Sequence, residues 1–295
     1  MRIPKLIKPG NGIMYEQAKN GKNHKVNGSY PFFSLEAGLT QEHKDFFEEY
    51  GFIHFKNFVS KEVVAQMLAE SERIQEQWIK EDRKLVNGTP IKYGKDVDGK
   101  TIVQRFAFLN QFGEIFQNFL RDPRLQGLFE LNGDVESRIG ETEKDGLVFN
   151  HYVNTTDSNY TQLGWHTDAL RDIFYGNKVM PMLNVGLHMD HSTPENGGLR
   201  ILPGTHNKGL ATLLFRKVYY LSNKADKKEI GLSVEPGDLT VHDGRLWHRV
   251  AQSPHVGEKS RRRVMYVPII TGKFQPRTAQ SKPLFYQRFM TVTDK

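Results

Sequence analysis

Apolar residues recur at helical spacing in the N-terminal part of the chain. After Thr40, a residue type that caps helix starts, Phe46, Phe47 and Tyr50 fall on one helical face. Gly51 follows them and is a typical helix end. The pattern therefore predicts an amphipathic helix between Thr40 and Gly51.

Further helices and a strand are predicted before the middle of the chain. A strand is expected at residues 52–55, and a second helix is expected to begin after Ser60 and to run to about Trp78. Residues 85–103 carry several Gly, Asn and Asp breaks and are typical of a loop or hairpin. Helix resumes at about residues 111–131, with a break near Asp122-Pro123.

Beyond this point the pattern changes to short apolar runs separated by Gly, Pro, Asn and Asp. The runs lie at Gly146–Val153, Pro181–Met189, Leu199–Leu202, Leu239–Val241 and Val264–Ile270. This alternation predicts a mainly β protein with flanking α-helices. The expected fold is a double-stranded β-helix, a cupin-like jelly roll with the N-terminal helices packed on one sheet.

The same pattern indicates one folded domain. We expect an irregular N-terminal arm at residues 1–38 and a single jelly-roll domain at residues 39–295. Within it, helices would occupy about residues 39–135 and the barrel core about residues 140–272, followed by a C-terminal extension.

Composition narrows the possible partners. The net charge is +7, but 41 basic residues are interspersed with 34 acidic ones, so nucleic-acid binding is not expected. The sequence has no long apolar run, so no membrane span is expected. It also lacks the apolar segment of a signal peptide, so export is not expected. With no Cys, a cytoplasmic location is favoured and thiolate metal sites are excluded. A small-molecule substrate is expected, and the sequence does not predict an oligomeric state.

One motif carries candidate metal chemistry. His166 and Asp168 are two residues apart, so in an extended strand both side chains would point to the same side. His248 lies in a later strand-like stretch, expected to face the first strand across a cavity. Two His and one carboxylate form the facial triad that holds non-haem Fe(II). A second His-x-Asp pair, His188 and Asp190, is the competing candidate.

A longer segment makes the motif more specific. The sequence "ENGGLRILPGTH" at residues 195–206 lies between "WHTD" and "LWH", and the stretch 39–67 contains "LTQEHKDFFEEYGFIHF". These features resemble the phytanoyl-CoA dioxygenase (PhyH) family of Fe(II)/2-oxoglutarate-dependent oxygenases. The resemblance covers roughly residues 39–270.

The resemblance implies that His166, Asp168 and His248 bind Fe(II), with 2-oxoglutarate and O2 as co-substrates. Because Asp168 is present, where related halogenases lack the carboxylate, hydroxylation is the expected outcome. The enzyme would hydroxylate an unactivated C–H of a small metabolite, amino-acid-like or a natural-product intermediate, and would release succinate and CO2. The alternatives are an acyl-CoA substrate, a cupin-type metalloenzyme that does not use 2-oxoglutarate, and a non-catalytic binding barrel.

The distal carboxylate of 2-oxoglutarate needs a cationic partner, and the resemblance implies an Arg on the strand after His248. Arg261, Arg262 and Arg263 are the candidates. Strand alternation with inward Val264 favours an inward Arg262, with its two neighbours turned out to solvent. The bland alternative is a solvated basic edge without a ligand.

Other site residues follow from their places beside these motifs. Asn154 and Thr205 are weaker candidates for contact with 2-oxoglutarate. Asn150, Trp165 and Arg171 are candidates for substrate contact. Turn formation explains the two Asn residues equally well, and packing or surface solvation is at least as good an explanation for Trp165 and Arg171.

Overall fold

The structure is a computed structural model that describes residues 30–36, 38–155, 158, 160–170, 178–220 and 222–283, without the side chain of Leu210. Its contacts divide the chain into two units, Met1–Phe32 and Phe33–Lys295. Most of the predicted N-terminal arm therefore lies outside the described residues. The predicted start of a single domain at residue 39 stays a prediction. No helix in the described ranges has the length and apolarity needed to cross a membrane.

The first helices begin and end where the sequence predicts. Helix α1 spans Gln41–Tyr50, with the Thr40 hydroxyl accepting from the backbone N–H of His43 and Gly51 in the left-handed conformation. Strand β1 spans Phe52–Phe55, and helix α2 spans Lys61–Lys80 after the Ser60 cap. These ends are set by local capping chemistry, which explains why the sequence alone locates them.

Shorter helices follow β5 (Thr101–Phe106). The predicted break at Asp122-Pro123 is present, because α3 ends before it and the Asp122 carboxylate caps α4. The elements of this region are the 3-10 helix Leu109–Gln111, α3 (Glu114–Leu120), α4 (Pro123–Gly127) and the 3-10 helix Leu128–Asn132.

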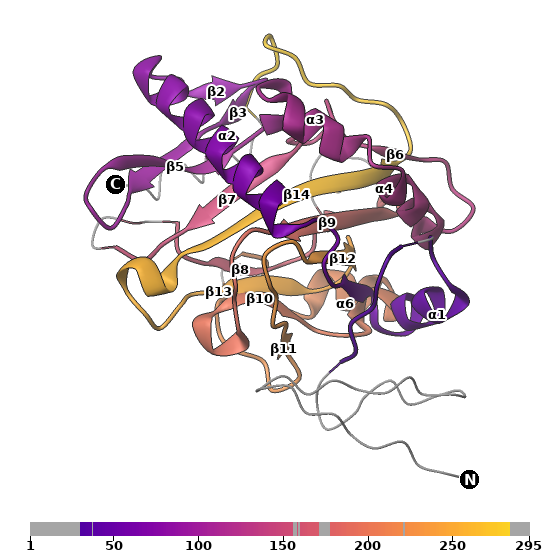
Figure 1. Ribbon diagram of the computed structural model, residues 1–295. Coiled ribbons are helices and arrows are strands. Elements are labelled where there is room, and N and C mark those ends of the chain that lie inside the picture. The colour runs from indigo at the N-terminus through magenta and orange to yellow at the C-terminus, as the bar shows by residue number, and fades with distance from the viewer. Residues whose placement is uncertain are drawn as a thin grey trace, which may run out of the picture. The chain divides into compact units, whose positions relative to one another are not determined.

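A large antiparallel sheet forms one layer of the second unit (Figure 1). Its strand order is β1-β12-β9-β14-β7-β5-β4, and β6 pairs with β14. Beyond β1 and β5, its strands are β4 (Lys92–Lys95), β6 (Ser137–Ile139), β7 (Val148–Tyr152), β9 (Met182–His188), β12 (Leu239–Asp243) and β14 (Arg262–Thr271). Residues 85–103, predicted as loop or hairpin, form two hairpins, of which β4-β5 extends this sheet.

A four-stranded sheet forms the second layer, in the order β11-β10-β13-β8. The two antiparallel layers confirm the predicted jelly roll with flanking helices. The strands are β8 (Leu163–His166), β10 (Gly198–Ile201), β11 (Ile230–Gly231) and β13 (His248–Ala251). The remaining elements are the hairpin β2 (Leu85–Val86) and β3 (Thr89–Pro90), the 3-10 helices Pro194–Asn196, Thr205–Asn207 and Gly257–Ser260, and α6 (Gly209–Phe215).

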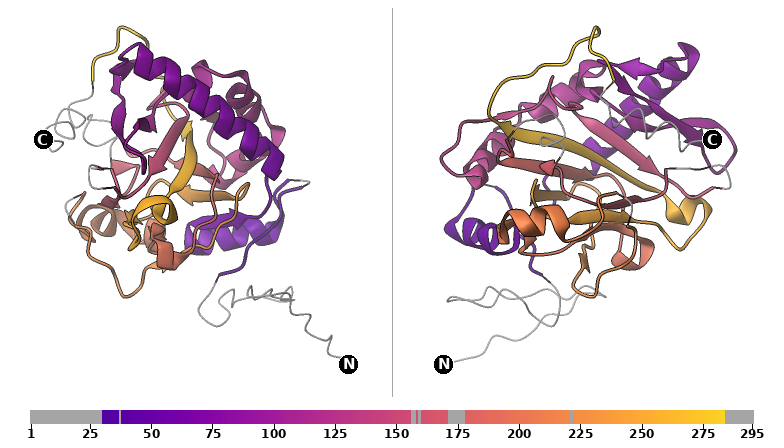
Figure 2. Two further views of the ribbon diagram at one scale, coloured as in Figure 1. Left: turned by 60° about the vertical axis from the view of Figure 1, so that its left-hand side comes forward. Right: turned by 180° about the vertical axis from the view of Figure 1, so that it is seen from behind.

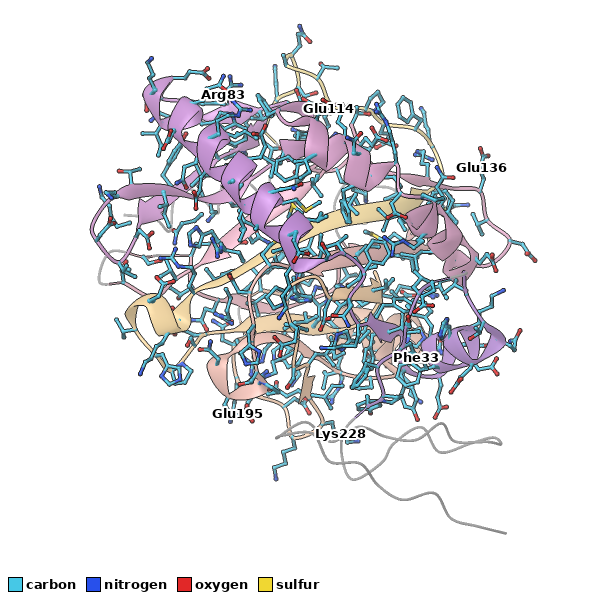
Figure 3. The ribbon with its side chains drawn as sticks, in the orientation of Figure 1. Phe33, Arg83, Glu114, Glu136, Glu195 and Lys228 are labelled. Atoms are coloured by element: carbon cyan, nitrogen blue, oxygen red, sulfur yellow. The ribbon has the colours of Figure 1, made fainter. Side chains whose placement is uncertain are left out.

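Helix α2 crosses the large sheet on the face turned away from the small sheet (Figure 2). It packs there through Trp78, whose ring centroid lies 5.2 Å from that of Phe106 in β5. The Gln75 side chain also accepts a hydrogen bond of 2.8 Å from the backbone N–H of Val103. Side chains fill the space between the layers, and charged residues such as Glu136 and Glu195 lie at the periphery (Figure 3).

Candidate metal and co-substrate site

Three candidate metal ligands converge on the small sheet. One ligand atom from each of His166, Asp168 and His248 can be chosen so that all three lie within 4.8 Å of one another. All three residues are buried, with 4 to 5% of each exposed. Two imidazole nitrogens and a carboxylate oxygen therefore meet at one point in the interior.

The route by which they meet differs from the prediction in two respects. Strand β8 ends at His166, so Asp168 lies beyond the strand and does not share its alternation. His248 opens β13, which is the hydrogen-bonded neighbour of β8, with His248 directly opposite His166. The prediction of a ligand strand facing β8 across a cavity was wrong. Adjacent positions on paired strands bring the two imidazoles together instead, with ring centroids 4.1 Å apart.

The hydrogen bonds of both imidazoles prepare them for metal binding. His166 Nδ1 lies 2.7 Å from the Gly164 carbonyl oxygen, and His248 Nδ1 lies 2.9 Å from the Leu246 carbonyl oxygen. A carbonyl can only accept, so each Nδ1 carries the proton and each Nε2 keeps a lone pair for a metal. Burial, followed by the neighbouring His166 and His242, holds the pKa of His248 well below its ordinary value. A neutral ring is the form that binds a metal.

The competing pair is used elsewhere in the fold. His188 Nε2 lies 3.0 Å from the Thr240 hydroxyl. Asp190 accepts hydrogen bonds from the side chain of Arg263 at 2.7 and 3.0 Å. Both side chains thus have partners away from the triad. Among the described residues, neither His188 nor Asp190 belongs to a group of three possible metal ligands.

Two further residues contact the triad, and sequence reasoning did not assign them. Asn184 donates a hydrogen bond of 2.9 Å to Oδ2 of Asp168, and His242 Nε2 lies 3.5 Å from the same oxygen. His242 and Asn184 are directly opposite each other on β12 and β9. In the sequence, His242 stands out only as the neighbour of Asp243, and this pair lacks the His-x-Asp spacing of His166 and Asp168.

A cavity opens beside the triad, with an empty volume of about 1120 Å³ that includes open solvent. Its metal end is lined by His166, Asp168, His248, His242 and Asn184. Apolar and aromatic side chains form its middle, and polar and charged side chains from the β2-β5 region and from residues 144–146 form another part of its lining. A concave site with an apolar middle and a few polar groups is typical of small-molecule binding.

Arg262 is the buried member of the arginine run, with 5% of the residue exposed. Its guanidinium donates to the carbonyl oxygens of Ala251 at 2.9 Å and Thr161 at 3.4 Å, and its Nε has no hydrogen-bond partner. Burial lowers the pKa of Arg262 to about 10. None of these partners is an anion, although a buried guanidinium gains most from an anionic partner.

The position of Arg262 relates it to the triad through a second, smaller cavity. That cavity is lined by Arg262 and by Tyr152, Leu199, Val250 and Tyr266, and the last four residues also line the larger cavity. The two spaces therefore lie side by side.

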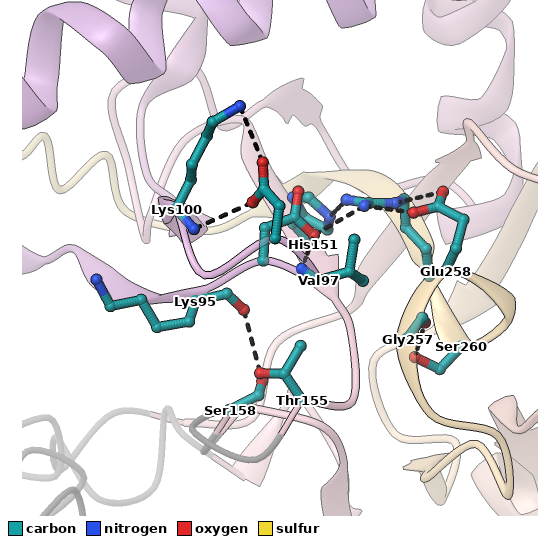
Figure 4. Close-up of polar contacts among 12 residues, drawn as sticks. Lys95, Val97, Lys100, His151, Thr155, Ser158, Gly257, Glu258 and Ser260 are labelled. Carbon is teal, nitrogen blue, oxygen red and sulfur yellow. Dashed lines mark hydrogen bonds and ion pairs between the residues drawn. The ribbon is translucent and has the colours of Figure 1, made fainter.

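Strand alternation predicted that Arg261 and Arg263 face solvent, and this prediction was wrong. Arg261 binds Asp96 at 2.8 Å and Glu258 at 2.6 Å, and its Nη1 lies 2.6 Å from Nε2 of His151 (Figure 4). Its side chain is only 13% exposed, and that of Arg263 is 19% exposed. Both cations are occupied by structural ion pairs, because half-buried charges need partners.

The other candidate residues are distributed between cavity and core. Asn150 lines the larger cavity and accepts a hydrogen bond of 3.2 Å from the Tyr160 hydroxyl. The Asn154 amide instead donates to the carbonyl oxygens of residues 253 and 255, at 2.7 and 2.9 Å. Thr205 accepts from the backbone N–H of Trp247 at 3.1 Å. These contacts tie both side chains to the backbone of other segments, and their contact with 2-oxoglutarate stays a prediction.

Trp165 does not line the described cavity. Trp165 is fully buried in an apolar cluster with Leu170, Leu202 and Trp247. Its indole N–H donates to the Lys224 carbonyl oxygen at 2.9 Å. Arg171 lies outside the described residues.

Comparisons with known proteins place this site in context. The model of the family "Phytanoyl-CoA dioxygenase (PhyH)" matches residues 47–262. No curated protein matches the sequence.

Solved structures share the fold at low identity. AviO1 from Streptomyces viridochromogenes Tue57 is 18% identical, with a TM-score of 0.55 over 82% of this chain and 100% of its own. HygX from Streptomyces hygroscopicus, solved with nickel and 2-oxoglutarate bound, is 15% identical, with a TM-score of 0.57 over 81% of this chain and 89% of its own. SnoN, a non-haem α-ketoglutarate-dependent epimerase from nogalamycin biosynthesis, is 15% identical, with a TM-score of 0.56 over 83% and 86%.

Proposed function

The chain belongs to the phytanoyl-CoA dioxygenase (PhyH) family, and from this premise we propose that it hydroxylates an unactivated C–H bond of a small metabolite. It is an Fe(II)/2-oxoglutarate-dependent oxygenase with a His-Asp-His triad. The proposed substrate is an amino-acid-like molecule or a natural-product intermediate. Bound iron and 2-oxoglutarate supply the oxidising chemistry, in which 2-oxoglutarate and O2 become succinate and CO2 while one oxygen atom enters the substrate.

One observation carries the proposal: the ligand atoms of His166, Asp168 and His248 lie within 4.8 Å of one another beside a cavity. We assign these three residues as the iron ligands. Two nitrogens and one carboxylate oxygen suit divalent iron and leave positions open for the co-substrate and O2. The carbonyl partners of both Nδ1 atoms fix which ring nitrogen faces the metal.

Arg262 is our candidate for the distal carboxylate of 2-oxoglutarate. Its burial and its uncharged hydrogen-bond partners support this role, because a guanidinium in such a place gains most from a bidentate anion. The four residues shared by the two cavities would then surround the co-substrate. The chain positions both reactants and limits the access of water, while the redox chemistry resides in the cofactor.

Hydroxylation is proposed as the outcome because Asp168 keeps a carboxylate beside the two His residues. Structural neighbours include an epimerase and a carbocyclase according to their titles, so the outcome needs its own test. Hydroxylation adds one oxygen to the product mass, ring closure or desaturation removes two hydrogens, and epimerisation leaves the mass unchanged. Mass spectrometry of the product therefore separates these outcomes.

The first experiment is an anaerobic titration of the apo protein with Fe(II) and then with 2-oxoglutarate. We expect the weak visible charge-transfer band of the iron chelate to appear. In Arg262→Ala, a higher 2-oxoglutarate concentration should be needed to form this band. Succinate release in air with a metabolite panel then identifies substrates. If iron binds but the band never forms, the protein is a metalloenzyme that does not use 2-oxoglutarate, as in the cupin-type alternative.

A further inference from the structure

A segment that belongs to neither sheet contacts the strand that carries the first proposed metal ligand. This segment follows α6 and includes Tyr219 and Tyr220. Strand β8 lies at the edge of the small sheet, and its Trp165 exchanges backbone hydrogen bonds with the segment. The Tyr220 N–H donates to the Trp165 carbonyl oxygen at 2.8 Å, and the Trp165 N–H donates to the Ser222 carbonyl oxygen at 2.9 Å. The segment therefore covers the edge of β8 that β13 does not pair.

Gly164 allows the segment to approach β8 closely. A Cβ atom at position 164 would lie 2.3 Å from the Tyr220 carbonyl oxygen, far inside van der Waals contact. A side chain at this position would therefore displace the segment. The ligand strand thus carries a residue that the close approach requires.

The Tyr220 ring lies against the imidazole of His166. The ring centroids are 4.8 Å apart and the ring planes differ by 21°, so the two rings are stacked. On the same imidazole, Nδ1 is held by the Gly164 carbonyl oxygen at 2.7 Å. The hydrogen bond holds one edge of the imidazole and the stacked ring holds its plane. Together they set the direction in which Nε2 points.

Tyr219 acts on the backbone between the two ligands of the His-x-Asp motif. Its hydroxyl donates a hydrogen bond of 2.8 Å to the carbonyl oxygen of Thr167, the residue before Asp168. Strand β8 ends before Thr167, so the pairing of that strand does not place Asp168. The backbone is held there by the Tyr219 hydroxyl and by the Ala169 N–H, which donates to the Gly244 carbonyl oxygen at 2.8 Å.

The backbone of Tyr220 has an uncommon conformation. Its φ of 57° is in the left-handed region, which bulky residues rarely adopt. Such a conformation persists only where the surrounding structure holds it, and it is concentrated at functional sites. Here it occurs where two consecutive side chains both reach the ligand segment, one at His166 and the other at Thr167.

We propose that Tyr219 and Tyr220 are positioning residues for the metal site. Tyr220 sets the plane of the His166 ring, and Tyr219 sets the backbone that carries Asp168. This inference rests on the ligand assignment proposed above and adds two residues that act through those ligands. Both come from the connection between α6 and β11, so this connection completes the site from outside the two sheets.

The test is an anaerobic titration of the full metal-free chain with Co(II), followed by visible absorption. The titration gives the affinity, and the spectrum of the loaded protein depends on how the ligands are arranged. We expect Tyr219→Phe and Tyr220→Leu each to lower the Co(II) affinity by about tenfold or more and to change the spectrum. Tyr220→Phe keeps the stacked ring and should retain the wild-type affinity and spectrum.

The matched control for the loss of a hydroxyl is Tyr93→Phe. The Tyr93 hydroxyl also donates to a backbone carbonyl, that of Arg83 at 2.6 Å, and Tyr93 does not line the cavity. This variant should leave the Co(II) affinity and spectrum unchanged. Thermal unfolding of the metal-free proteins is measured alongside, because a merely structural role would lower the unfolding temperature and leave the Co(II) spectrum as in the wild type.

Two results would overturn the proposal. One is wild-type affinity and spectrum in both Tyr219→Phe and Tyr220→Leu. The other is an equal loss in Tyr220→Phe and Tyr220→Leu, which would assign the effect to the hydroxyl and not to the stacked ring.

Two further measurements separate this inference from the proposed function. If His166→Ala keeps the wild-type Co(II) affinity and spectrum, the ligand assignment fails and the positioning role fails with it. The Fe(II)/2-oxoglutarate absorption band of the wild-type protein is recorded in parallel. If the band does not form while the Co(II) titrations behave as expected, the proposed co-substrate chemistry fails and the positioning role stands.

Discussion

His242 Nε2 lies 3.5 Å from Oδ2 of Asp168, the carboxylate oxygen that also accepts a 2.9 Å hydrogen bond from Asn184. His242 is 1% exposed, and neither ring nitrogen has a hydrogen-bond partner in the described part of the chain. Its ring centroid lies 4.4 Å from that of His248. Two residues on paired strands thus surround the carboxylate that we assign as a metal ligand.

Removing either neighbour of Asp168 should weaken metal binding. For His242→Ala and Asn184→Ala we expect Fe(II) affinity to fall by roughly 10- to 100-fold, because such partners orient the ligand carboxylate. Anaerobic calorimetric titration with Fe(II) measures the change. The matched control is His188→Ala, a buried His of the large sheet bonded to Thr240, which should leave the affinity unchanged. Wild-type affinity in both test variants would show that these contacts do not set the carboxylate.

Replacing a proposed ligand should have a larger effect. We expect His166→Ala or Asp168→Ala to abolish Fe(II) binding with little change in unfolding temperature, because each change removes a proposed metal ligand and leaves the apolar side chains of the core in place. Iron titration and thermal unfolding measure the two quantities. If both variants retain iron affinity, the site lies elsewhere, and His188 with Asp190 becomes the next pair to replace.

Arg262→Ala should act on the co-substrate. We expect the apparent Michaelis constant for 2-oxoglutarate to rise by an order of magnitude or more, because a charge-assisted hydrogen bond contributes about 1.5–3 kcal/mol. Succinate formation at varied 2-oxoglutarate concentration measures the change. Arg261→Ala is the control and should lower the unfolding temperature instead, since Arg261 binds Asp96 and Glu258. If Arg261→Ala raises the Michaelis constant and Arg262→Ala does not, strand alternation selected the wrong arginine.

The features that sequence could predict are those with local causes. Thr40 and Gly51 delimit α1 because a cap hydroxyl and a left-handed glycine act within one helical turn. Alternation in β14 singled out Arg262 as buried, because side chains of one strand take opposite faces. The cluster of His166, Asp168 and His248 was predictable because these residue types, at this spacing, form a metal-ligand motif.

Contacts between distant strands were not predictable where no motif connects the residues involved. His242 reaches Asp168 because β12 pairs with β9, and nothing in its own neighbourhood encodes that register. Lys92 reaches the cavity because the segment read as a loop or hairpin joins the edge of the large sheet. The Asn154 amide donates to the Ser253 carbonyl oxygen about a hundred positions later, a contact that its own neighbourhood does not encode. In each case the deciding contact is remote in sequence.

A buried hydrogen-bond network around Asp238, the residue before β12, should make the free energy of unfolding depend on pH. Asp238 is fully buried and contacts His54 Nε2 at 3.0 Å and Lys56 Nζ at 2.6 Å. Burial acts to raise the pKa of Asp238, but the hydrogen bonds from His54 and Lys56 outweigh it and lower the pKa to about 2, from an ordinary 3.8. The folded state therefore holds this proton more weakly than the unfolded state.

The sign of the effect follows from that difference. Ionised Asp238 stabilises the fold fully above about pH 5, and this contribution is lost as the pH falls through 3.8 toward 2. The shift corresponds to about 2 kcal/mol, of which roughly half should be lost by pH 3. Urea unfolding of wild type and Asp238→Asn from pH 6 to pH 3 measures it, because other groups titrate alike in both proteins. The stability difference should be constant above about pH 5 and shrink below it. A difference that stays constant down to pH 3 would show that Asp238 has an ordinary pKa.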